Sequence, residues 1–276
     1  NPRLVYGRLT CWGQVGPLAT TAGHDMNYRG LTGALFAIGR KGAPPVPPLN
    51  LVADYGGGAL YLAFGMLAGL LEAKGSGKGQ VIDTAMVDGA ASLMLSAYGL
   101  HAAGLYVDER GSNILDSGAP FYEVYECSDG GFMAVGPIEA KFRSEFFELI
   151  GLDEKAIPNS DDRANWDAVK ALISAKFAAH PRAHWEKVFD GSDACVSPVL
   201  SMAEAPQHPH LKARGTFVEI DGVLQPGPAP RFSRTVPDLP KGPELPGAGT
   251  DEALAEWGFA AERIAALKAD KIVGNI

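Results

Sequence analysis

The first third of the sequence predicts an α/β fold, on the evidence of two strand-like and two helix-like segments. Apolar, strand-like runs cover residues 4–10 and 80–85, and we expect the first of them to be buried. Between them lie two helix-like runs, residues 25–39 and about 57–73. The order strand, helix, helix, strand is typical of layered α/β folds, in which helices cover a sheet.

The rest of the chain is expected to contain helices and one hairpin. Residues 121–126 and 132–135 alternate in polarity and flank Ser128-Asp129-Gly130-Gly131, which indicates a β-hairpin. Residues 224–243 are rich in proline and predict an extended linker, because proline fixes φ and lacks a donor. Further helices are expected at residues 86–106, 140–150, 166–179, 184–189 and 251–269.

The charge, the cysteines and the apolar runs limit the possible function classes. A net charge of −8 argues against nucleic acid as a partner. Cys11, Cys127 and Cys195 are odd in number and lack metal-ligand spacing, so we expect reduced thiols and a cytoplasmic protein. The longest apolar run, residues 60–71, is too short to cross a bilayer, and we expect no membrane partner.

Two titratable side chains stand at the starts of helix-like runs. His24 precedes the first run, and Asp54 occupies the position expected of an N-cap before the second. A neutral histidine and a carboxylate are the usual pair for moving a proton off carbon and back onto it. Helix N-termini also direct free N–H groups at negative charge. Taken alone, however, His24 could be a structural histidine, Asp54 a helix cap, and Glu139 an exposed carboxylate at a helix start.

Three other patterns do not predict a site. Residues 75–79 contain Lys78 among glycines, but they follow a helix and precede a strand, the reverse of a phosphate-binding loop. His180 and His184 have the spacing of metal ligands, but Pro181 lies between them and a third ligand is not evident nearby. We therefore expect no metal. The Gly-x-Ser-x-Gly motif of α/β-hydrolases does not occur either, so the sequence does not predict that class of enzyme.

Longer stretches of the sequence resemble a known family. The opening NPRLVYGRLTCWGQVGP is similar to the family III CoA-transferases. Further stretches resemble the α-methylacyl-CoA racemase branch of that family: GHDMNY, PPLNLVADYGGG, GSGKGQVIDTAMVDGA, GAPFYEVYECSDGGFMAVGPIE and HPHLKARGTF. The resemblance runs in order through essentially the whole chain.

The resemblance implies a Rossmann-like large domain, N-terminally incomplete here, a small α+β domain, and two subunits threaded as interlocked rings. We expect the large domain at residues 1–86 and again at 228–276. A linker helix at 87–121 and a linker at 204–227 would flank the small domain at 122–203. Members of the family begin further upstream, so we expect this chain by itself to bind CoA weakly.

The resemblance also implies roles for individual residues. His24 and Asp54 match the catalytic histidine and aspartate, and Glu139 matches an acidic residue that approaches the histidine from the partner subunit. The backbone N–H of Asp25 matches the group that binds the thioester oxygen. The other residues expected around the substrate and its oxyanion are Tyr28, Gly56, Gly57 and Tyr122. The expected partners are an acyl-CoA substrate and a second copy of the chain, with no separate cofactor because CoA is part of the substrate.

The implied reaction is racemisation of 2-methylacyl-CoA thioesters through an enolate, in lipid metabolism. The carbon next to a thioester is weakly acidic, so a base and hydrogen-bond donors to the oxyanion are needed. One alternative is CoA transfer, with Asp54 as the nucleophile. His24 favours the racemase, since a transferase has no evident use for a base there. A catalytically silent fragment that still dimerises is the other alternative.

Overall fold

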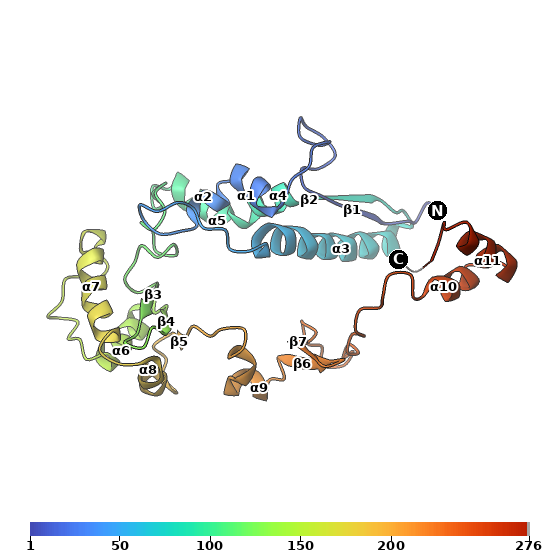
Figure 1. The fold of residues 1–276 in the computed structure, drawn as a ribbon. Helices are drawn as coiled ribbons and strands as arrows, with labels where there is room; N and C mark the ends of the chain where they lie inside the picture. Colours follow the sequence, from blue (N-terminus) through green and yellow to red (C-terminus); the bar gives the residue numbers. More distant parts are fainter. Residues whose placement is uncertain (275–276) are drawn as a thin grey trace. The chain divides into compact units, whose positions relative to one another are not determined.

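The computed structural model describes residues 1–274, which form two compact units (Figure 1). The first unit covers Asn1–Val199 and the second begins at Leu200. The first unit contains β1 (Tyr6–Thr10), α1 (Asp25–Leu31), α2 (Ala34–Ala37), the π-helical segment η1 (Leu51–Ala59), α3 (Leu60–Ser76), β2 (Val81–Ala85), α4 (Met86–Leu93), α5 (Leu95–Ala102), β3 (Glu123–Glu126), β4 (Phe132–Val135), α6 (Ala140–Leu149), the 3₁₀ turn η2 (Arg163–Asn165), α7 (Trp166–Phe177), α8 (Arg182–Phe189) and β5 (Val196–Pro198).

The predicted order strand, helix, helix, strand is confirmed. β1 and β2 pair in parallel, from Tyr6 opposite Val81 to Thr10 opposite Ala85, and α3 packs on both strands. Glycines let this helix approach closely, since a methyl group at Gly65 would lie 2.9 Å from the Cγ2 of Ile82. The expected burial of the first strand is wrong: the side chain of Tyr6 is 52% exposed. The helix layer of α3 leaves the side chains that point away from it in solvent.

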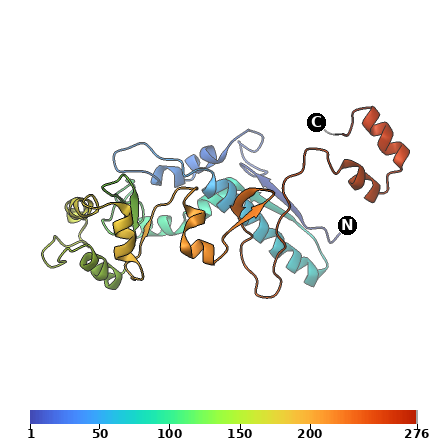
Figure 2. The same ribbon diagram turned by 60° about the horizontal axis from the view of Figure 1, so that its bottom comes forward.

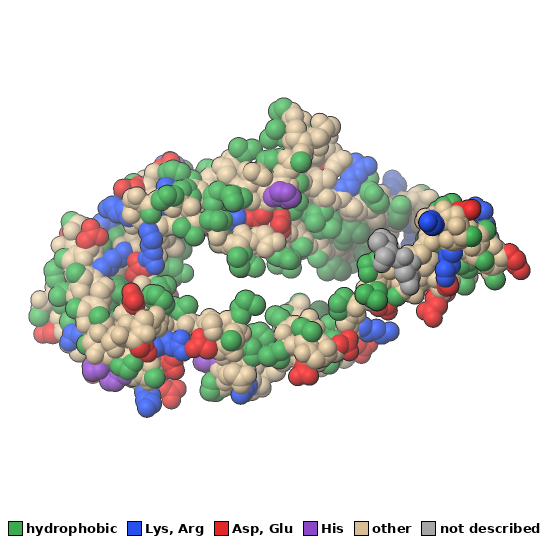
Figure 3. Space-filling view, viewed as in Figure 1, with side chains coloured by type: hydrophobic (Ala, Val, Ile, Leu, Met, Phe, Trp, Pro, Cys, Tyr) green, Lys and Arg blue, Asp and Glu red, His purple; other side chains and the backbone are tan. Residues whose placement is uncertain are grey.

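One face of α3 is apolar and exposed. Its residues follow helical spacing and are 68–74% exposed: Leu60, Phe64, Leu67 and Leu71 (Figure 3). With η1, the helix forms a continuous stretch of 26 residues, Leu51–Ser76, in which a window of 18 residues has a mean hydropathy of 1.3 and is 22% buried. This stretch is longer than the apolar run that the sequence indicates. By length and composition alone it could cross a membrane, a weak criterion that core helices of soluble proteins also meet.

Two expected helices of the first unit are each divided in the structure. The helix expected at residues 25–39 breaks between α1 and α2, because Gly33 adopts a left-handed conformation with φ of 75°. The helix expected at residues 86–106 ends and restarts at Met94, whose N–H bonds to the Ala91 carbonyl in a tighter turn. Helical periodicity continues across both breaks, so the sequence pattern did not reveal them.

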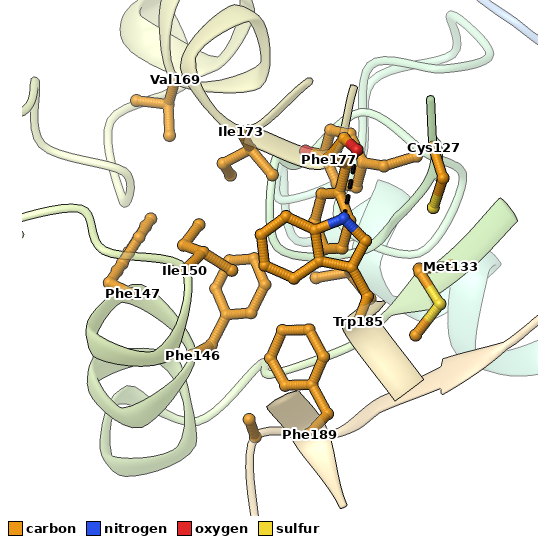
Figure 4. Packing of buried hydrophobic residues seen from close by; sticks show 13 residues of the cluster. Cys127, Met133, Phe146, Phe147, Ile150, Val169, Ile173, Phe177, Trp185 and Phe189 are labelled. Atoms are coloured by element: carbon orange, nitrogen blue, oxygen red, sulfur yellow. Dashed lines mark hydrogen bonds between the residues drawn. The ribbon is translucent and has the colours of Figure 1, made fainter. Parts of the chain in front are cut away.

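The predicted hairpin is confirmed and extended by a third strand. β3 and β4 pair antiparallel, with Glu123 opposite Val135, and β4 also pairs with β5. α7 and α8 pack on these strands. The resulting core is aromatic, and the indole N–H of Trp185 donates to the Phe177 carbonyl at 3.1 Å (Figure 4). These strands and helices form a small α+β assembly with its own core.

The second unit contains η3 (Ala205–Gln207), α9 (Pro209–Ala213), β6 (Phe217–Ile220), β7 (Val223–Pro226), α10 (Thr250–Glu256) and α11 (Ala261–Ala269) (Figure 2). β6 and β7 form a hairpin through Asp221 and Gly222, both with positive φ. The linker expected at residues 224–243 is therefore wrong at its start, where the chain pairs as β7. The helix expected at residues 251–269 is divided at Gly258, whose φ is 86°.

Candidate functional site

His24 stands at the start of α1 with its side chain exposed. Its backbone N–H donates to the Asn27 side-chain oxygen at 2.9 Å, and its carbonyl accepts from the Asn27 N–H at 2.7 Å. This reciprocal pairing fixes the first turn of the helix. The imidazole is thereby held at the helix start and remains accessible to a substrate.

Asp54 lies inside a helical segment and does not cap one. The expectation of a helix beginning near Gly57 is wrong, because helical backbone begins at Leu51 with Asn50 as its N-cap. The first bond of this segment joins the Tyr55 N–H to the Asn50 carbonyl, five residues back. Such π-helical geometry is rare and often marks functional sites. The half-buried Asp54 carboxylate therefore sits in the first turn, at the positive end of the helix dipole.

The Asp54 carboxylate accepts two side-chain hydrogen bonds. The Tyr28 hydroxyl donates to one oxygen, and the Asn50 amide donates to the other at 3.3 Å. Tyr28 is 1% exposed and packs perpendicular to the Trp12 indole, with ring centroids 5.7 Å apart. Burial, followed by the bond to Asp54, raises the pKa of Tyr28 well above its usual value. The phenol is therefore a permanent donor that reaches the site through Asp54.

The side chain of Asp25 joins α1 to η1. It is buried, and one carboxylate oxygen accepts the N–H groups of Ala53 at 3.0 Å and Asp54 at 2.9 Å. The other oxygen forms an ion pair with Arg29, one helical turn later. Sequence reasoning gave Asp25 a role through its backbone alone and missed Arg29. The available signal was the i,i+4 spacing of opposite charges on an otherwise uncharged helix.

Gly57 serves the packing of η1 on α4. A methyl group at this buried position would lie 2.7 Å from the Ala90 nitrogen, and one at Gly89 would lie 1.8 Å from the Gly57 carbonyl. Gly57 therefore lets two backbones meet, in addition to its expected place around the substrate, which stays a prediction. Gly56 is half-buried, and a methyl group there would lie 3.0 Å from the Leu51 carbonyl.

Tyr122 and Glu139 belong to the small α+β assembly. Glu139 precedes α6, is exposed, and lies near the exposed Cys195: partial desolvation raises the pKa of that thiol, and the Glu139 carboxylate adds to the effect. The Tyr122 ring lies beside Gly136. Across residues 1–274, neither side chain shares a hydrogen bond or an ion pair with His24. Within the described residues, hydrogen bonds therefore join the predicted residues of α1 and η1 to one another, and none joins Tyr122 or Glu139 to His24.

The arrangement offers proton chemistry. An imidazole and a carboxylate stand on two helix starts that Asp25 links, beside the N–H of Asp25, which as the first of α1 has no acceptor within its helix. Within the described part of the chain, residues 1–274, His, Cys, Asp and Glu do not gather in threes as a metal ion would need.

Comparison with known proteins gives consistent matches. The model of CoA-transferase family III matches residues 1–252. Mouse α-methylacyl-CoA racemase is 45% identical, over 99% of this chain and 72% of its own length, and the human racemase is 42% identical over the same shares. A CAIB/BAIF family protein from Brucella suis has a similar structure, with a TM-score of 0.75 and 25% identity over 93% of this chain and 68% of its own.

More distant relatives include transferases. Acetyl-CoA:oxalate CoA-transferase from Acetobacter aceti is 30% identical over 82% of this chain and 59% of its own length. The family match covers both the segment with His24 and Asp54 and the small α+β assembly. Together with the similarity in structure, it shows that this chain belongs to CoA-transferase family III and has the family's α/β fold.

Proposed function

We propose that this chain catalyses the racemisation of 2-methylacyl-CoA thioesters by moving one proton off the α-carbon and another onto its opposite face. The observation that carries the proposal is the pairing of His24 and Asp54 on two helix starts that Asp25 ties together. The high identity to the mouse and human racemases supports the same reaction.

The chemistry begins at the α-carbon. His24, as neutral imidazole, takes the proton from one face, and the electrons of the C–H bond move into the thioester carbonyl to form an enolate. The backbone N–H of Asp25, at the first position of α1, has no acceptor within its helix and would donate to the enolate oxygen. The dipole of the helix adds favourable charge at this point.

Asp54 completes the inversion. As a carboxylic acid it gives its proton to the opposite face of the enolate, which regenerates the thioester with the other configuration. The enzyme then holds a protonated His24 and an anionic Asp54, the state that acts on the other epimer with the roles exchanged. Tyr28 and Asn50 donate to the carboxylate and so support this anionic state.

We further infer that Glu139 reaches His24 from a second copy of the chain. Glu139 is exposed and precedes α6, whose phenylalanines belong to a different buried cluster from Tyr28 of α1. A carboxylate beside the imidazole would stabilise its protonated form after proton abstraction. The proposed active unit is therefore a homodimer with two sites.

CoA transfer is the second candidate, favoured by the match to CoA-transferase family III and by the Acetobacter aceti relative. In that reaction Asp54 would attack the acyl carbonyl and release CoA thiolate, forming a mixed anhydride. The thiolate would then attack the Asp54 carbonyl, break the anhydride bond and expel the acyl group as a carboxylate, which leaves a CoA thioester on Asp54.

One experiment separates the two candidates. The protein is incubated with a single epimer of a 2-methylacyl-CoA, with and without a short-chain carboxylic acid, and the thioesters are resolved by chiral chromatography. The proposal predicts that the two epimers approach equal amounts in both mixtures. It also predicts that hydroxylamine added during turnover does not inactivate the enzyme, because a racemase forms no covalent intermediate. Appearance of a new acyl-CoA, with CoA attached to Asp54 by mass spectrometry, would establish the transferase instead.

A further inference from the structure

We propose that the buried pair Asp25 and Arg29 sets the position of Asp54 relative to His24, and so determines whether a proton is delivered with inversion. The inference rests on the proposed racemase reaction. Both residues would be positioning residues, since they act on the backbone that carries the bases.

Asp25 caps η1 from another helix. The first bond of η1 begins at the Tyr55 N–H, so the preceding N–H groups of Ala53 and Asp54 lack acceptors within their own helix. The N-cap residue Asn50 makes no side-chain capping bond to them, and the Asp25 carboxylate accepts both. A negative charge at a helix N-terminus is also favoured by the dipole. Asp25, the residue directly after His24, therefore binds the backbone of Asp54.

Arg29 links the second carboxylate oxygen of Asp25 to the segment that precedes η1. Its Nε pairs with the second oxygen of Asp25, and its Nη2 donates to the Leu49 carbonyl at 3.0 Å, just before η1 begins. The side chains of Arg29 and Asp25 are 1% and 7% exposed. Solvent therefore cannot replace either partner, and removal of one leaves an uncompensated charge in the interior.

The relative position of His24 and Asp54 affects the configuration of the product. Proton removal by His24 and proton delivery by Asp54 must occur on opposite faces of one planar enolate. A displacement of about 1 Å can slow a reaction roughly 100-fold. Loosening η1 against α1 would impair delivery by Asp54 more than removal by His24. The enolate would then more often take a proton back on its original face.

The test uses Asp25→Asn, which keeps an acceptor oxygen but loses the charge that pairs with Arg29. Arg29→Lys is a second, milder variant that keeps the charge and loses the planar, two-sided contact. The matched control is Glu186→Gln, which breaks another i,i+4 ion pair, that with Arg182 on α8.

Two measurements are made on each protein. The first is hydrogen exchange at the amides of Ala53 and Asp54, which we expect to be faster by about tenfold in Asp25→Asn, as for the loss of a bond to a charged acceptor. The second is the product ratio in D₂O from a single epimer: inverted against retained product carrying α-deuterium. We expect this ratio to fall at least about threefold in Asp25→Asn, less in Arg29→Lys, and to stay constant in Glu186→Gln.

The results distinguish this proposal from the proposed function. An unchanged product ratio with a uniformly lower rate would overturn the positioning role, because a merely structural defect scales both products equally. Unchanged amide exchange would overturn the capping role, and this measurement needs no activity. Absence of any racemisation in the unaltered protein would instead count against the proposed function, with the exchange measurement still judging the cap. Should Asp25→Asn not fold, Arg29→Lys gives the same two readouts.

Discussion

The phenol of Tyr28 donates a hydrogen bond to the Asp54 carboxylate, across the contact between α1 and η1. Tyr28 is buried, and its pKa lies well above the usual value because burial and the neighbouring carboxylate oppose ionisation. The phenol therefore remains protonated throughout the working pH range. Asp54 thus has a fixed donor that orients its carboxylate and favours its anionic state.

Tyr28→Phe should lower kcat by roughly 10- to 100-fold with little change in KM. A hydrogen bond to a charged group contributes about 1.5–3 kcal/mol, and here it acts on the proton-transfer group and not on the CoA portion of the substrate. Steady-state racemisation kinetics measure the effect. The phenylalanine ring keeps the contact with Trp12, so the melting temperature serves as the control for folding. A kcat equal to that of the unaltered protein would show that the phenol does not support Asp54.

Gly57→Ala should destabilise the first unit by roughly 1–3 kcal/mol, the usual cost of overpacking. The new methyl group would meet the backbone of α4 at 2.7 Å, which forces η1 away from that helix. The matched control is Gly99→Ala in α5, where a methyl group meets nothing within 4 Å. That change should stabilise the protein by about 0.5–1 kcal/mol, because alanine favours helix. Urea unfolding measures both, and equal effects at the two positions would contradict the packing account.

Local patterns predicted the strand order and the hairpin, because these depend on alternation and on turn residues near one another in the sequence. The π-helical register of η1 was not predictable in this way. It depends on the meeting of Gly57 with α4 and on acceptance of the Asp54 N–H by Asp25, and both partners are distant along the chain. The exposure of β1 was likewise missed, since an apolar strand pattern does not state which faces are covered.

The candidate site was likewise only partly predictable from the sequence. His24 and Asp54 each have an ordinary structural interpretation, and family resemblance singled them out. The structure supplied what joins them: the buried carboxylate of Asp25, with Arg29 as its counter-ion. A sequence pattern can show opposite charges one helical turn apart, but not that the pair is buried against the start of another helix.

The buried Tyr125 should make the free energy of unfolding decrease at alkaline pH. Its hydroxyl donates to the Pro120 carbonyl at 2.5 Å, and burial raises its pKa above the ordinary value of 10.0. The stabilisation is therefore fully present below pH 10 and is lost as the pH rises above it, because the unfolded chain releases this proton first. The free energy of unfolding should fall as the pH rises above 10.

Tyr125→Phe should cost about 1 kcal/mol at pH 8 and give a shallower decline above pH 10. Urea unfolding at pH 8 and pH 10.5 measures both effects. Tyr6→Phe is the control, since Tyr6 is 52% exposed and should leave the decline as it was. An identical pH dependence in Tyr125→Phe would show that another group causes the decline.

Mixed dimers test the proposed contribution of Glu139. A His24→Ala chain and a Glu139→Gln chain are each expected to be nearly inactive. In a heterodimer, one site combines an intact His24 with an intact Glu139, and the other carries both changes. Refolding equal amounts together should recover about a quarter of the unaltered activity, since about half of the dimers are mixed and each has one intact site. Proven heterodimers that show no recovery would mean that Glu139 acts within its own chain or plays no part.

The most direct test of the account is α-deuterium incorporation from D₂O, measured with each epimer of one 2-methylacyl-CoA. The unaltered protein should label the α-carbon from either epimer. We predict that His24→Ala loses proton removal from one epimer and Asp54→Asn loses it from the other, with racemisation abolished in both, because each base serves one face. Labelling that continues undiminished from both epimers in both variants would contradict the assignment of these two residues as the proton-transfer pair.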